Sequence, residues 1–280
     1  MLIQKNIIIK PDADKPIVLD VGYQANGIQK PVVIFAHGFK GFKDWGHFNM
    51  MMEHFVAHNY VFVKFNFSHN GGTVEQPIDF PDLEAFGNNN YTKELNDLKS
   101  VVDWVEDNPK VPKKEMDLNQ IFLIGHSRGG GVAVLAAHED KRIKKLVCWA
   151  PVADLINRFS SNQLKEWKEK GVMYIPNART KQEMPLYYQL AEDTLNNKER
   201  FNICKAAKAL SIPHLIVHGT QDEAVDISEG RSIRQWSVAS AFFVVEGGNH
   251  TFGAYHPYLE KNMPEDAQKV LTRTLAFLGE

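Results

Sequence analysis

The sequence predicts an α/β fold in which helices cover both faces of a mostly parallel central sheet. Runs of β-branched and aromatic residues, typical of buried strands, occur at 31–36, 60–65, 121–124, 145–149, 212–219 and 241–246. Helical patterns separate most of these runs, and this alternation favours parallel strands joined by crossover helices. A fold of this class commonly forms one domain at this length, so we expect a single domain over residues 1–280.

The flanking elements follow in chain order. Segments 3–9 and 17–23, joined by a Pro-Asp-Ala-Asp turn, look like an antiparallel hairpin at the edge of the sheet. Helices are expected near 44–58, 91–108, 132–138 and 265–278. The stretch 66–90 is polar and rich in glycine. We expect it to form an irregular loop, and a loop this long in a compact domain is usually functional or mobile.

Segment 151–210 is far longer than a single crossover helix requires. We expect it to hold an inserted helical cap, with amphipathic stretches at 153–170 and 184–196, a turn-rich middle at 171–180 and a crossover helix near 198–210. The cap aromatics Trp167 and Tyr187 are candidates to line a mostly apolar substrate pocket. The alternative for each is that it only holds the cap to the sheet.

Residues 121–130 read Ile-Phe-Leu-Ile-Gly-His-Ser-Arg-Gly-Gly, so a buried strand runs directly into the pattern Gly-x-Ser-x-Gly. A helical stretch follows, and in this strand–turn–helix setting the motif is a nucleophile elbow. The small residues Gly125 and Gly129 allow the strand and the helix to approach closely beneath the turn. The pattern therefore predicts that Ser127 is a nucleophile rather than a plain helix N-cap.

A serine near neutral pH needs a base, and an acid that orients the base, to act as a nucleophile. Asp222 lies in the loop that follows the strand 212–219, and His250 lies in the loop that follows the strand 241–246. Because functional groups of open α/β sheets gather at the carboxyl ends of the strands, we expect both side chains near Ser127. The chain order is Ser, Asp, His.

This order and its flanking strands resemble the α/β-hydrolase family over nearly the whole chain. The resemblance implies the α/β-hydrolase fold and a division of roles in which Ser127 attacks, His250 transfers the proton and Asp222 orients the imidazole. It also implies an oxyanion hole, with one donor at the backbone N–H of Arg128, directly after the nucleophile. The His-Gly-x loop that follows an earlier strand would supply the second donor, the backbone N–H of Phe39.

The acid and the base each have alternatives. Asp222 could instead cap the helix that starts near Asp226, and Glu223 or Asp226 could be the acid. His256 lies six residues after His250, past an aromatic turn and directly before a proline. The loop positions of the resemblance favour Asp222 and His250.

The other histidines have structural interpretations. His37 is expected to bond loop backbone near the oxyanion hole, and His218 is expected to be a satisfied histidine of the core. The remaining ones show no metal-ligand spacing such as His-Glu-x-x-His: His47, His54, His58, His69, His138 and His214. We therefore predict no catalytic metal and no cofactor.

The length and position of the cap resemble those of bacterial carboxylesterases, including cinnamoyl and feruloyl esterases, in the dienelactone-hydrolase-like part of the family. One departure is Arg128, where related esterases often carry Gln, Met or Leu. Its backbone donor survives this change. Its guanidinium either pairs with a carboxylate of the cap or a loop, or meets an anionic substrate group.

Composition excludes several other classes of protein. A net charge of −2 and a pI near 6.6 provide no basic field for nucleic acid. The two cysteines, Cys148 and Cys204, read as small apolar residues of a reducing compartment. No signal peptide is indicated, and no apolar run approaches the ~20 residues of a membrane span. The sequence predicts a cytoplasmic location and a small-molecule partner, and leaves the oligomeric state open.

These observations predict a serine hydrolase that cleaves carboxylic esters through an acyl-enzyme. A prolyl-oligopeptidase-type peptidase or a thioesterase shares the fold and the residue order, although the peptidase usually carries an accessory domain. A catalytically silent binding protein of the same fold is the alternative outside enzymes. Silent members commonly lose the serine or the histidine, whereas this chain keeps a candidate at every position.

Overall fold

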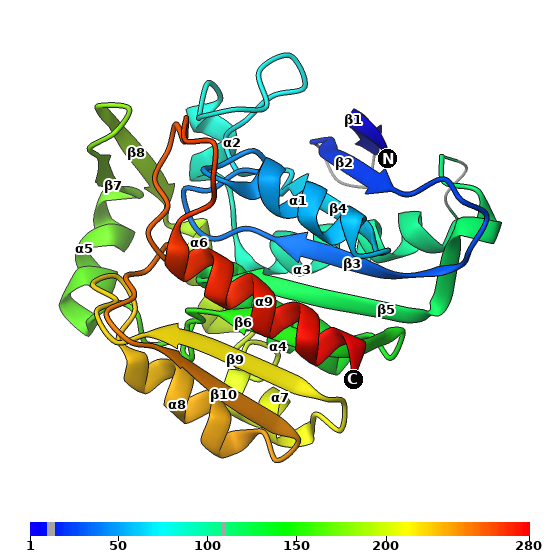
Figure 1. The fold of residues 1–280 in the computed structure, drawn as a ribbon. Coiled ribbons are helices and arrows are strands. Elements are labelled where there is room, and N and C mark those ends of the chain that lie inside the picture. The colour runs from blue at the N-terminus through cyan, green and yellow to red at the C-terminus, as the bar shows by residue number, and fades with distance from the viewer. Residues whose placement is uncertain (10–14, 108–109) are drawn as a thin grey trace.

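The structure is a computed structural model that describes residues 1–9, 15–107 and 110–280. Its centre is an eight-stranded sheet with the order β1-β2-β4-β3-β5-β6-β9-β10 (Figure 1). Its strands are β1 (Leu2–Ile9), β2 (Ile17–Tyr23), β3 (Lys30–Ala36), β4 (Val61–Asn66), β5 (Met116–His126), β6 (Ile143–Trp149), β9 (His214–Gly219) and β10 (Ser240–Val245). β1 and β2 run antiparallel, and the strands from β4 to β10 in this order are parallel.

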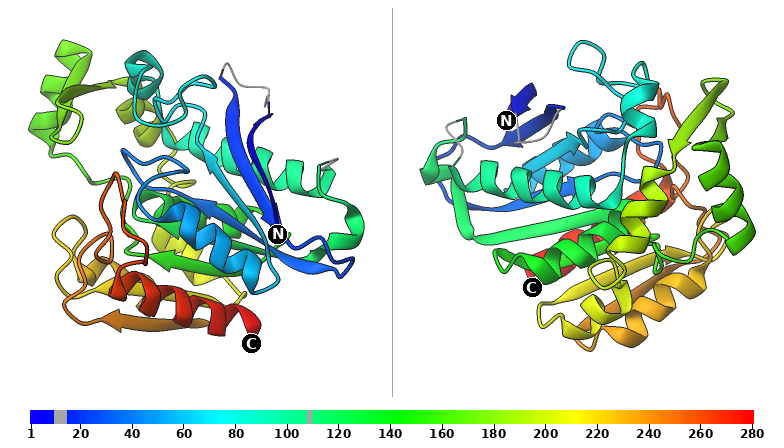
Figure 2. Two further views of the ribbon diagram at one scale, coloured as in Figure 1. Left: turned by 45° about the horizontal axis from the view of Figure 1, so that its top comes forward. Right: turned by 180° about the vertical axis from the view of Figure 1, so that it is seen from behind.

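Helices cover both faces of the sheet, as predicted. α1 (Phe48–Ala57) and α9 (Glu265–Gly279) lie on one face, and α3 (Tyr91–Asp107), α4 (Arg128–Glu139), α7 (Ile203–Ala209) and α8 (Ile227–Trp236) lie on the other (Figure 2). The strands alternate between the two layers: Val33 and Phe35 belong to the core beneath α1 and α9, and Val32 and Ile34 to the core beneath α3 and α4. Both faces are apolar because a parallel sheet is buried on both sides.

The N-terminal hairpin lies at the edge of the sheet, where the sequence predicted it, although its Pro-Asp-Ala-Asp turn falls outside the described residues. Helix α1 begins at Phe48, later than the predicted 44, because the preceding residues form the loop after β3. The long loop 66–90 contains one short helix, α2 (Leu83–Gly87), which Asp82 caps by accepting a hydrogen bond from the Ala85 N–H.

The cap differs from the helical cap that the sequence predicted. Its centre is a two-stranded antiparallel sheet of β7 (Val172–Asn177) and β8 (Gln182–Tyr187), flanked by α5 (Ser161–Lys170) and α6 (Gln189–Asn196). Of the turn-rich middle predicted at 171–180, residues 172–177 form a strand, and residues 178–180 lie in the turn that joins β7 to β8. Gly171 ends α5 with a φ of 72°, a backbone conformation that glycine adopts without steric cost, and the chain then continues as a strand.

The parallel strands align their carboxyl ends at one edge of the sheet, and the cap lies beyond this edge (Figures 1 and 2). Ala36 pairs with Gly125, Gly125 with Cys148, and Trp149 with Val217. The loops after β3, β5, β9 and β10 therefore leave the sheet together. Within the described ranges, no helix combines the length and apolar character that crossing a bilayer requires.

Candidate active site

Ser127 lies on a tight turn between β5 and α4, as the motif predicted. Its backbone has φ 57° and ψ −122°, in a region that side-chain-bearing residues rarely adopt. Three glycines allow the surrounding backbone to approach. A Cβ added at Gly125 would lie 2.3 Å from the Gly129 carbonyl oxygen, one at Gly129 would lie 2.3 Å from the His37 carbonyl oxygen, and one at Gly38 would lie 2.8 Å from the Ser127 Cβ. The turn therefore holds Ser127 against the loop after β3.

Asp222 and His250 meet at the same edge of the sheet. The His250 Nδ1 lies 2.8 Å from the Asp222 Oδ2, and their side chains are 15% and 0% exposed. The other carboxylate oxygen, Oδ1, accepts hydrogen bonds from the backbone N–H groups of Ala224 and Val225, at 2.9 and 2.8 Å. Both oxygens are therefore held, which fixes the plane of the carboxylate and the edge of the imidazole that faces it.

The alternatives to Asp222 and His250 have other partners. Asp226 caps α8 by accepting a hydrogen bond from the Ser228 N–H, and Glu223 is exposed. The His256 Nδ1 accepts a hydrogen bond from the Gly46 N–H at 2.9 Å, so this ring holds the loop before α1.

His218 is a contact of the acid that the sequence did not reveal. Its Nε2 lies 3.2 Å from the Asp222 Oδ2 and 2.9 Å from the Val225 carbonyl oxygen, and the ring is fully buried. Burial alone would raise the pKa of the Asp222 carboxyl, but hydrogen bonds from His218 and His250 outweigh it and leave the pKa far below its usual range. Asp222 therefore stays ionised. The i, i+4 spacing of His218 and Asp222 was the only sequence signal.

Ser127 and His250 together border two cavities, of about 270 and about 360 Å³. Among the described residues, no hydrogen bond joins the serine hydroxyl to the imidazole. Contacts between a nucleophile and its base are often loose in the absence of substrate. An occupant of either cavity therefore lies beside both Ser127 and His250.

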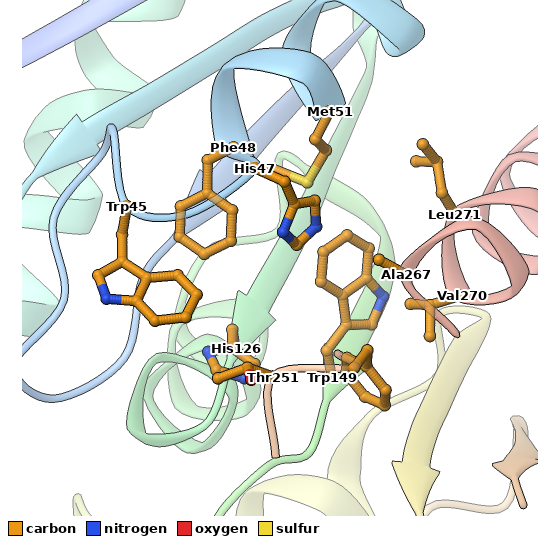
Figure 3. Close-up of a pocket in the computed structure, with 11 residues that line it drawn as sticks. Trp45, His47, Phe48, Met51, His126, Trp149, Thr251, Ala267, Val270 and Leu271 are labelled. Carbon is orange, nitrogen blue, oxygen red and sulfur yellow. The ribbon is translucent and has the colours of Figure 1, made fainter. Parts of the chain in front are cut away.

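His126 ties the serine turn to the loop that carries His250. Its Nε2 donates to the His250 carbonyl oxygen at 2.9 Å, and the two rings lie 4.9 Å apart. Burial, and then the neighbouring His250, lower the pKa of His126 to about 3, so the ring stays neutral and keeps this donor. Behind it, His47, side chains of α1 and α9, and Trp149 of β6 line a cavity of about 10 Å³ (Figure 3).

Two backbone amides beside Ser127 are free. Among the described residues, neither the Phe39 N–H nor the Arg128 N–H donates a hydrogen bond. The first amide of a helix has no partner within the helix, which explains Arg128. Phe39 lies in a turn that the hydrogen bond from the Gly41 N–H to the Gly38 carbonyl closes at 3.1 Å. Both residues border the larger cavity with Ser127.

His37 supports this turn, as the sequence predicted. Its Nδ1 bonds the Gly38 carbonyl oxygen at 2.9 Å, and its Nε2 accepts a longer hydrogen bond from the Phe67 N–H. Burial lowers the pKa of His37 to about 4, so the ring is neutral near neutral pH.

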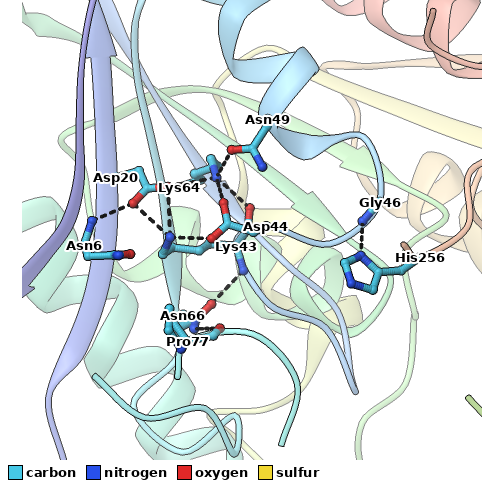
Figure 4. A network of polar contacts seen from close by, with 10 residues as sticks. All are labelled: Asn6, Asp20, Lys43, Asp44, Gly46, Asn49, Lys64, Asn66, Pro77 and His256. Atoms are coloured by element: carbon cyan, nitrogen blue, oxygen red, sulfur yellow. Dashed lines mark hydrogen bonds and ion pairs between the residues drawn. The ribbon is translucent and has the colours of Figure 1, made fainter. Parts of the chain in front are cut away.

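Four buried charges anchor the far end of the same loop, and no motif had indicated them. The Lys43 and Lys64 ammonium groups each lie 2.9 Å from an oxygen of Asp20, and both also contact Asp44 (Figure 4). The two positive and two negative charges balance. The Asn66 side chain accepts a hydrogen bond from the Lys43 N–H at 2.6 Å. Removing one member would leave a buried charge unpaired, which typically costs about 3–5 kcal/mol, so the network fixes the loop.

The Arg128 side chain pairs with Glu94 of α3. The sequence had left open whether the guanidinium pairs with a carboxylate of the protein or meets a substrate. It pairs with a carboxylate of the protein, which lies on a helix and not on the cap or a loop. The guanidinium carbon lies 4.4 Å from the centre of the Phe39 ring. Arg128 and Glu94 are 14% and 3% exposed. The pair therefore supports the residue that carries the free Phe39 amide.

The larger cavity is mostly apolar, and the predicted residues Trp167 and Tyr187 are not among those that line it. Its apolar walls come from α3, the segment after β6, the cap and the loop after β9: Tyr91, Val152, Leu155, Phe159, Ile175, Leu186, Leu190 and Val225. Trp167 lies behind this wall, where its Nε1 donates to the Leu186 carbonyl oxygen at 2.8 Å and its ring packs against Phe159. The Tyr187 hydroxyl bonds Glu84 at the surface.

Both predictions for a direct role in the pocket were therefore wrong. Tyr187 is the last residue of β8, and consecutive side chains of a strand point to opposite sides, so it faces away from its neighbour. The sequence had been interpreted as a helix there, which gives a different set of inward-facing residues. Among the residues placed in the structure, no group of three or more His, Cys, Asp or Glu side chains is arranged to hold a metal ion.

Solved structures share this fold over almost the entire chain. Est1E from Butyrivibrio proteoclasticus, with bound ferulic acid, superposes with a TM-score of 0.73 at 18% identity and covers 98% of this chain and 100% of its own. The α/β hydrolase GrgF from Penicillium sp. sh18 superposes with a TM-score of 0.75 at 17% identity and covers 99% and 98%. At these identities the similarity establishes the α/β-hydrolase fold.

Two proteins are similar to part of the sequence. The quorum-quenching protein AidA of Acinetobacter baumannii is 24% identical over 127 residues, which are 45% of this chain and 37% of that protein. A Mycoplasma pneumoniae protein with the provisional name esterase/lipase 3 is 28% identical over 164 residues, 56% and 50% of the two chains. The matches span half or less of each relative. The profile of the BD-FAE family covers residues 19–236, well over half of the sequence, and the chain therefore belongs to the BD-FAE family, whose members have the α/β-hydrolase fold of esterases.

Proposed function

We propose that the protein is a serine hydrolase that cleaves carboxylic esters through an acyl-enzyme. The observation that carries this proposal is the Asp222–His250 hydrogen bond beside a serine held at a positive φ, with two free backbone amides at the same cavity. A nucleophile, a base, an acid that orients the base and two donors for a developing oxyanion are the parts that acyl transfer requires.

In the proposed reaction the Ser127 oxygen attacks the ester carbonyl and His250 accepts the serine proton. Asp222 stabilises the imidazolium and holds its tautomer. The N–H groups of Phe39 and Arg128 donate to the oxyanion, and one such donor is typically worth about 3 kcal/mol in the transition state. His250 then gives the proton to the departing alcohol. Water, activated by the same imidazole, attacks the acyl-enzyme and releases the acid.

The larger cavity supports an apolar acyl group. Its volume of about 360 Å³ and its aliphatic and aromatic lining suit a short or medium acyl chain or an aromatic acid. The bound ferulic acid of the structural neighbour Est1E and the esterase/lipase name of one relative point to the same class of substrate. Trp167 acts in this proposal through the wall residue Leu186, and Tyr187 acts only in fixing the cap.

The protein is expected to work in the cytoplasm without a cofactor. Cys148 is buried and Cys204 is half-buried, and both thiols are free. A thioesterase or a peptidase would use the same groups on a different acyl compound. A silent binding protein would place the same groups without turnover.

The decisive experiment is the Ser127→Ala variant with esters and with a fluorophosphonate probe that labels active serines. We expect the wild type to hydrolyse p-nitrophenyl butyrate and to react with the probe. Ser127→Ala should lose both activities, by about 10⁴-fold or more in kcat, with an unchanged circular dichroism spectrum. Ser161→Ala, an exposed serine on α5, is the matched control. A wild type that neither turns over esters nor labels would favour the silent protein, and preference for thioesters or peptide anilides would assign those substrates.

A further inference from the structure

The smaller cavity beside Ser127 differs in chemistry from the larger one. It lies between the loop after β3 and the tip of the β7–β8 hairpin, and its polar lining includes Lys40, Asn177 and Arg179. No Asp or Glu is among its lining residues, so two cationic side chains face a cavity of about 270 Å³ without a carboxylate in its wall.

Lys40 has no carboxylate partner in the described part of the chain. Its Nζ lies 3.4 Å from the Pro176 carbonyl oxygen, the one contact of this ammonium group in that part. An ammonium group has three donors, and this long contact uses one of them. Lys40 directly follows Phe39, and both residues border the two cavities. Its charge is therefore available a short distance from the reacting carbonyl.

The hairpin tip adds two further donors. Asn177 is only 8% exposed, and its amide side chain makes no hydrogen bond within the described residues. Its amide atoms are not among the fully buried polar atoms that lack a partner, so they stay accessible and can bond an occupant of the cavity. Arg179 is held by Asp79 and lies above the Phe42 ring. One of its nitrogens bonds Asp79, which leaves other N–H groups of the guanidinium for a ligand.

The two cavities divide the ester between them. The acyl group stays covalently attached through both half-reactions, which suits the apolar cavity. The alcohol leaves after the first half-reaction and water replaces it, which suits the polar cavity that His250 also borders. Three cations border the apolar cavity. Arg128 and Arg158 are paired with Glu94 and Glu229, and Lys40 borders both cavities, whereas Asn177 and Arg179 line the smaller one and not the larger.

We propose that Lys40, Asn177 and Arg179 form a subsite for an anionic group, a carboxylate, on the alcohol portion of the ester. This inference rests on the proposed esterase function. The substrate class is an ester of an apolar acid with a hydroxy acid, and the carboxylate of the hydroxy acid accepts hydrogen bonds from the ammonium, amide and guanidinium groups.

The test compares two aryl esters of equal size that differ in charge. 4-Carboxyphenyl butyrate carries the anion on the leaving group, and 4-carbamoylphenyl butyrate replaces it by a neutral amide. Each kcat/KM is divided by the rate constant for hydroxide-catalysed hydrolysis of the same ester, which removes the difference in leaving-group reactivity. We expect the wild type to prefer the carboxylate by about tenfold, the factor that about 1.4 kcal/mol of charge-assisted hydrogen bonding provides.

Two variants and one control locate the preference. Lys40→Met and Arg179→Gln should each bring the ratio of the two normalised kcat/KM values towards one. Lys165→Met removes the same charge from the exposed face of α5 and should leave the ratio unchanged. The ratio is the readout because Lys40 adjoins the Phe39 amide and its substitution also affects the neutral ester. Raising the salt concentration from about 0.01 to 1 M should lower the wild-type ratio, since the Debye length falls from about 30 to about 3 Å.

The outcomes separate this inference from the proposed function. Hydrolysis of the neutral ester without a preference for its carboxylate analogue overturns the subsite and leaves the esterase intact. A preference that persists in Lys40→Met and in Arg179→Gln also overturns it. A preference for phenyl hydrogen succinate over phenyl butyrate, which moves the anion to the acyl side, overturns the assignment of the cavities. Hydrolysis of none of these esters contradicts the proposed function itself.

Discussion

The buried pair of Arg128 and Glu94 allows a quantitative prediction, because each partner is nearly inaccessible to solvent. Replacement Arg128→Met keeps the backbone N–H and the unbranched shape of the side chain but removes the charge. Glu94 is then left 3% exposed. Its Oε1 keeps one hydrogen bond, from the Asn89 amide at 2.8 Å, and its Oε2 has no hydrogen-bond partner among the described residues. A buried carboxylate without its cationic partner typically costs about 3–5 kcal/mol.

The stacking of the guanidinium on Phe39 adds to this loss. Its carbon lies 4.4 Å from the ring centre, a geometry worth about 0.5–2 kcal/mol. We therefore expect Arg128→Met to lower the free energy of unfolding by about 3.5–7 kcal/mol. Glu94→Gln alone should also be costly, because it leaves a buried guanidinium. The double variant leaves no unpaired charge and should cost less than the sum by about 2 kcal/mol or more.

The assay is urea-induced unfolding of the wild type, both single variants and the double variant at pH 7, with kcat/KM for a neutral ester measured alongside. A decrease in kcat/KM is expected in Arg128→Met, since the loop that presents the Phe39 amide loses its support. The reasoning is refuted if Arg128→Met costs less than about 1 kcal/mol, or if the two single costs add within about 0.5 kcal/mol. Unchanged stability with a selective loss for anionic esters would instead assign the guanidinium to substrate.

Three further predictions concern the acid, the cap and acid stability. Asp222→Asn should lower kcat by about 10⁴-fold because an amide favours the wrong imidazole tautomer, whereas Asp226→Asn, which retains a good helix cap, should leave steady-state kinetics nearly unchanged; the opposite pattern would reassign the acid. Trp167→Ala should lower the free energy of unfolding by about 3–5 kcal/mol. It should also change the ranking of kcat/KM over esters of increasing acyl length, because the indole holds the cavity wall, whereas Tyr187→Phe should preserve that ranking. A ranking preserved in both variants would show that the cap does not set acyl specificity. Burial lowers the pKa of His47 to about 4 from an unfolded value near 6.5, so its contribution to stability is present above pH 6.5 and is lost as pH falls towards 4. Between pH 7 and 4.5 the free energy of unfolding of His47→Phe should therefore fall by about 2 kcal/mol less than that of the wild type. An equal fall in both proteins would contradict the assignment.

Local sequence determined the elements around the site and the order of its candidate residues. The apolar runs that precede Ser127, Asp222 and His250 predict strands that end directly before them, and the alternation with helices makes those strands parallel. Parallel strands end at one edge, so the three residues were expected to lie close together. The structure brings Asp222 and His250 into hydrogen-bond contact and places Ser127 beside the same cavities as His250.

The cap shows where local patterns failed. The sequence was interpreted as a turn-rich middle at 171–180 and as an amphipathic stretch of a helical cap at 184–196, whereas the pairing of β7 with β8 makes 172–177 and 182–187 strands. Burial then follows the pairing, so Leu186 faces the cavity while Tyr187 turns outward. Propensity over a few residues cannot encode this choice, because the stabilising contacts are made with another segment.

Tertiary structure alone decided which charges meet. Lys43 reaches Asp20 of β2, and Arg128 reaches Glu94 of α3. The sequence does not show whether a charged side chain is solvated or buried, because burial depends on whether distant segments pack around it and exclude water. The sequence by itself therefore determined the class of fold and the order of the candidate catalytic groups, which follow from local hydrophobic patterns. Folding decided the supports of those groups and the chemistry of the two cavities, because both arise from contacts between residues far apart in the chain.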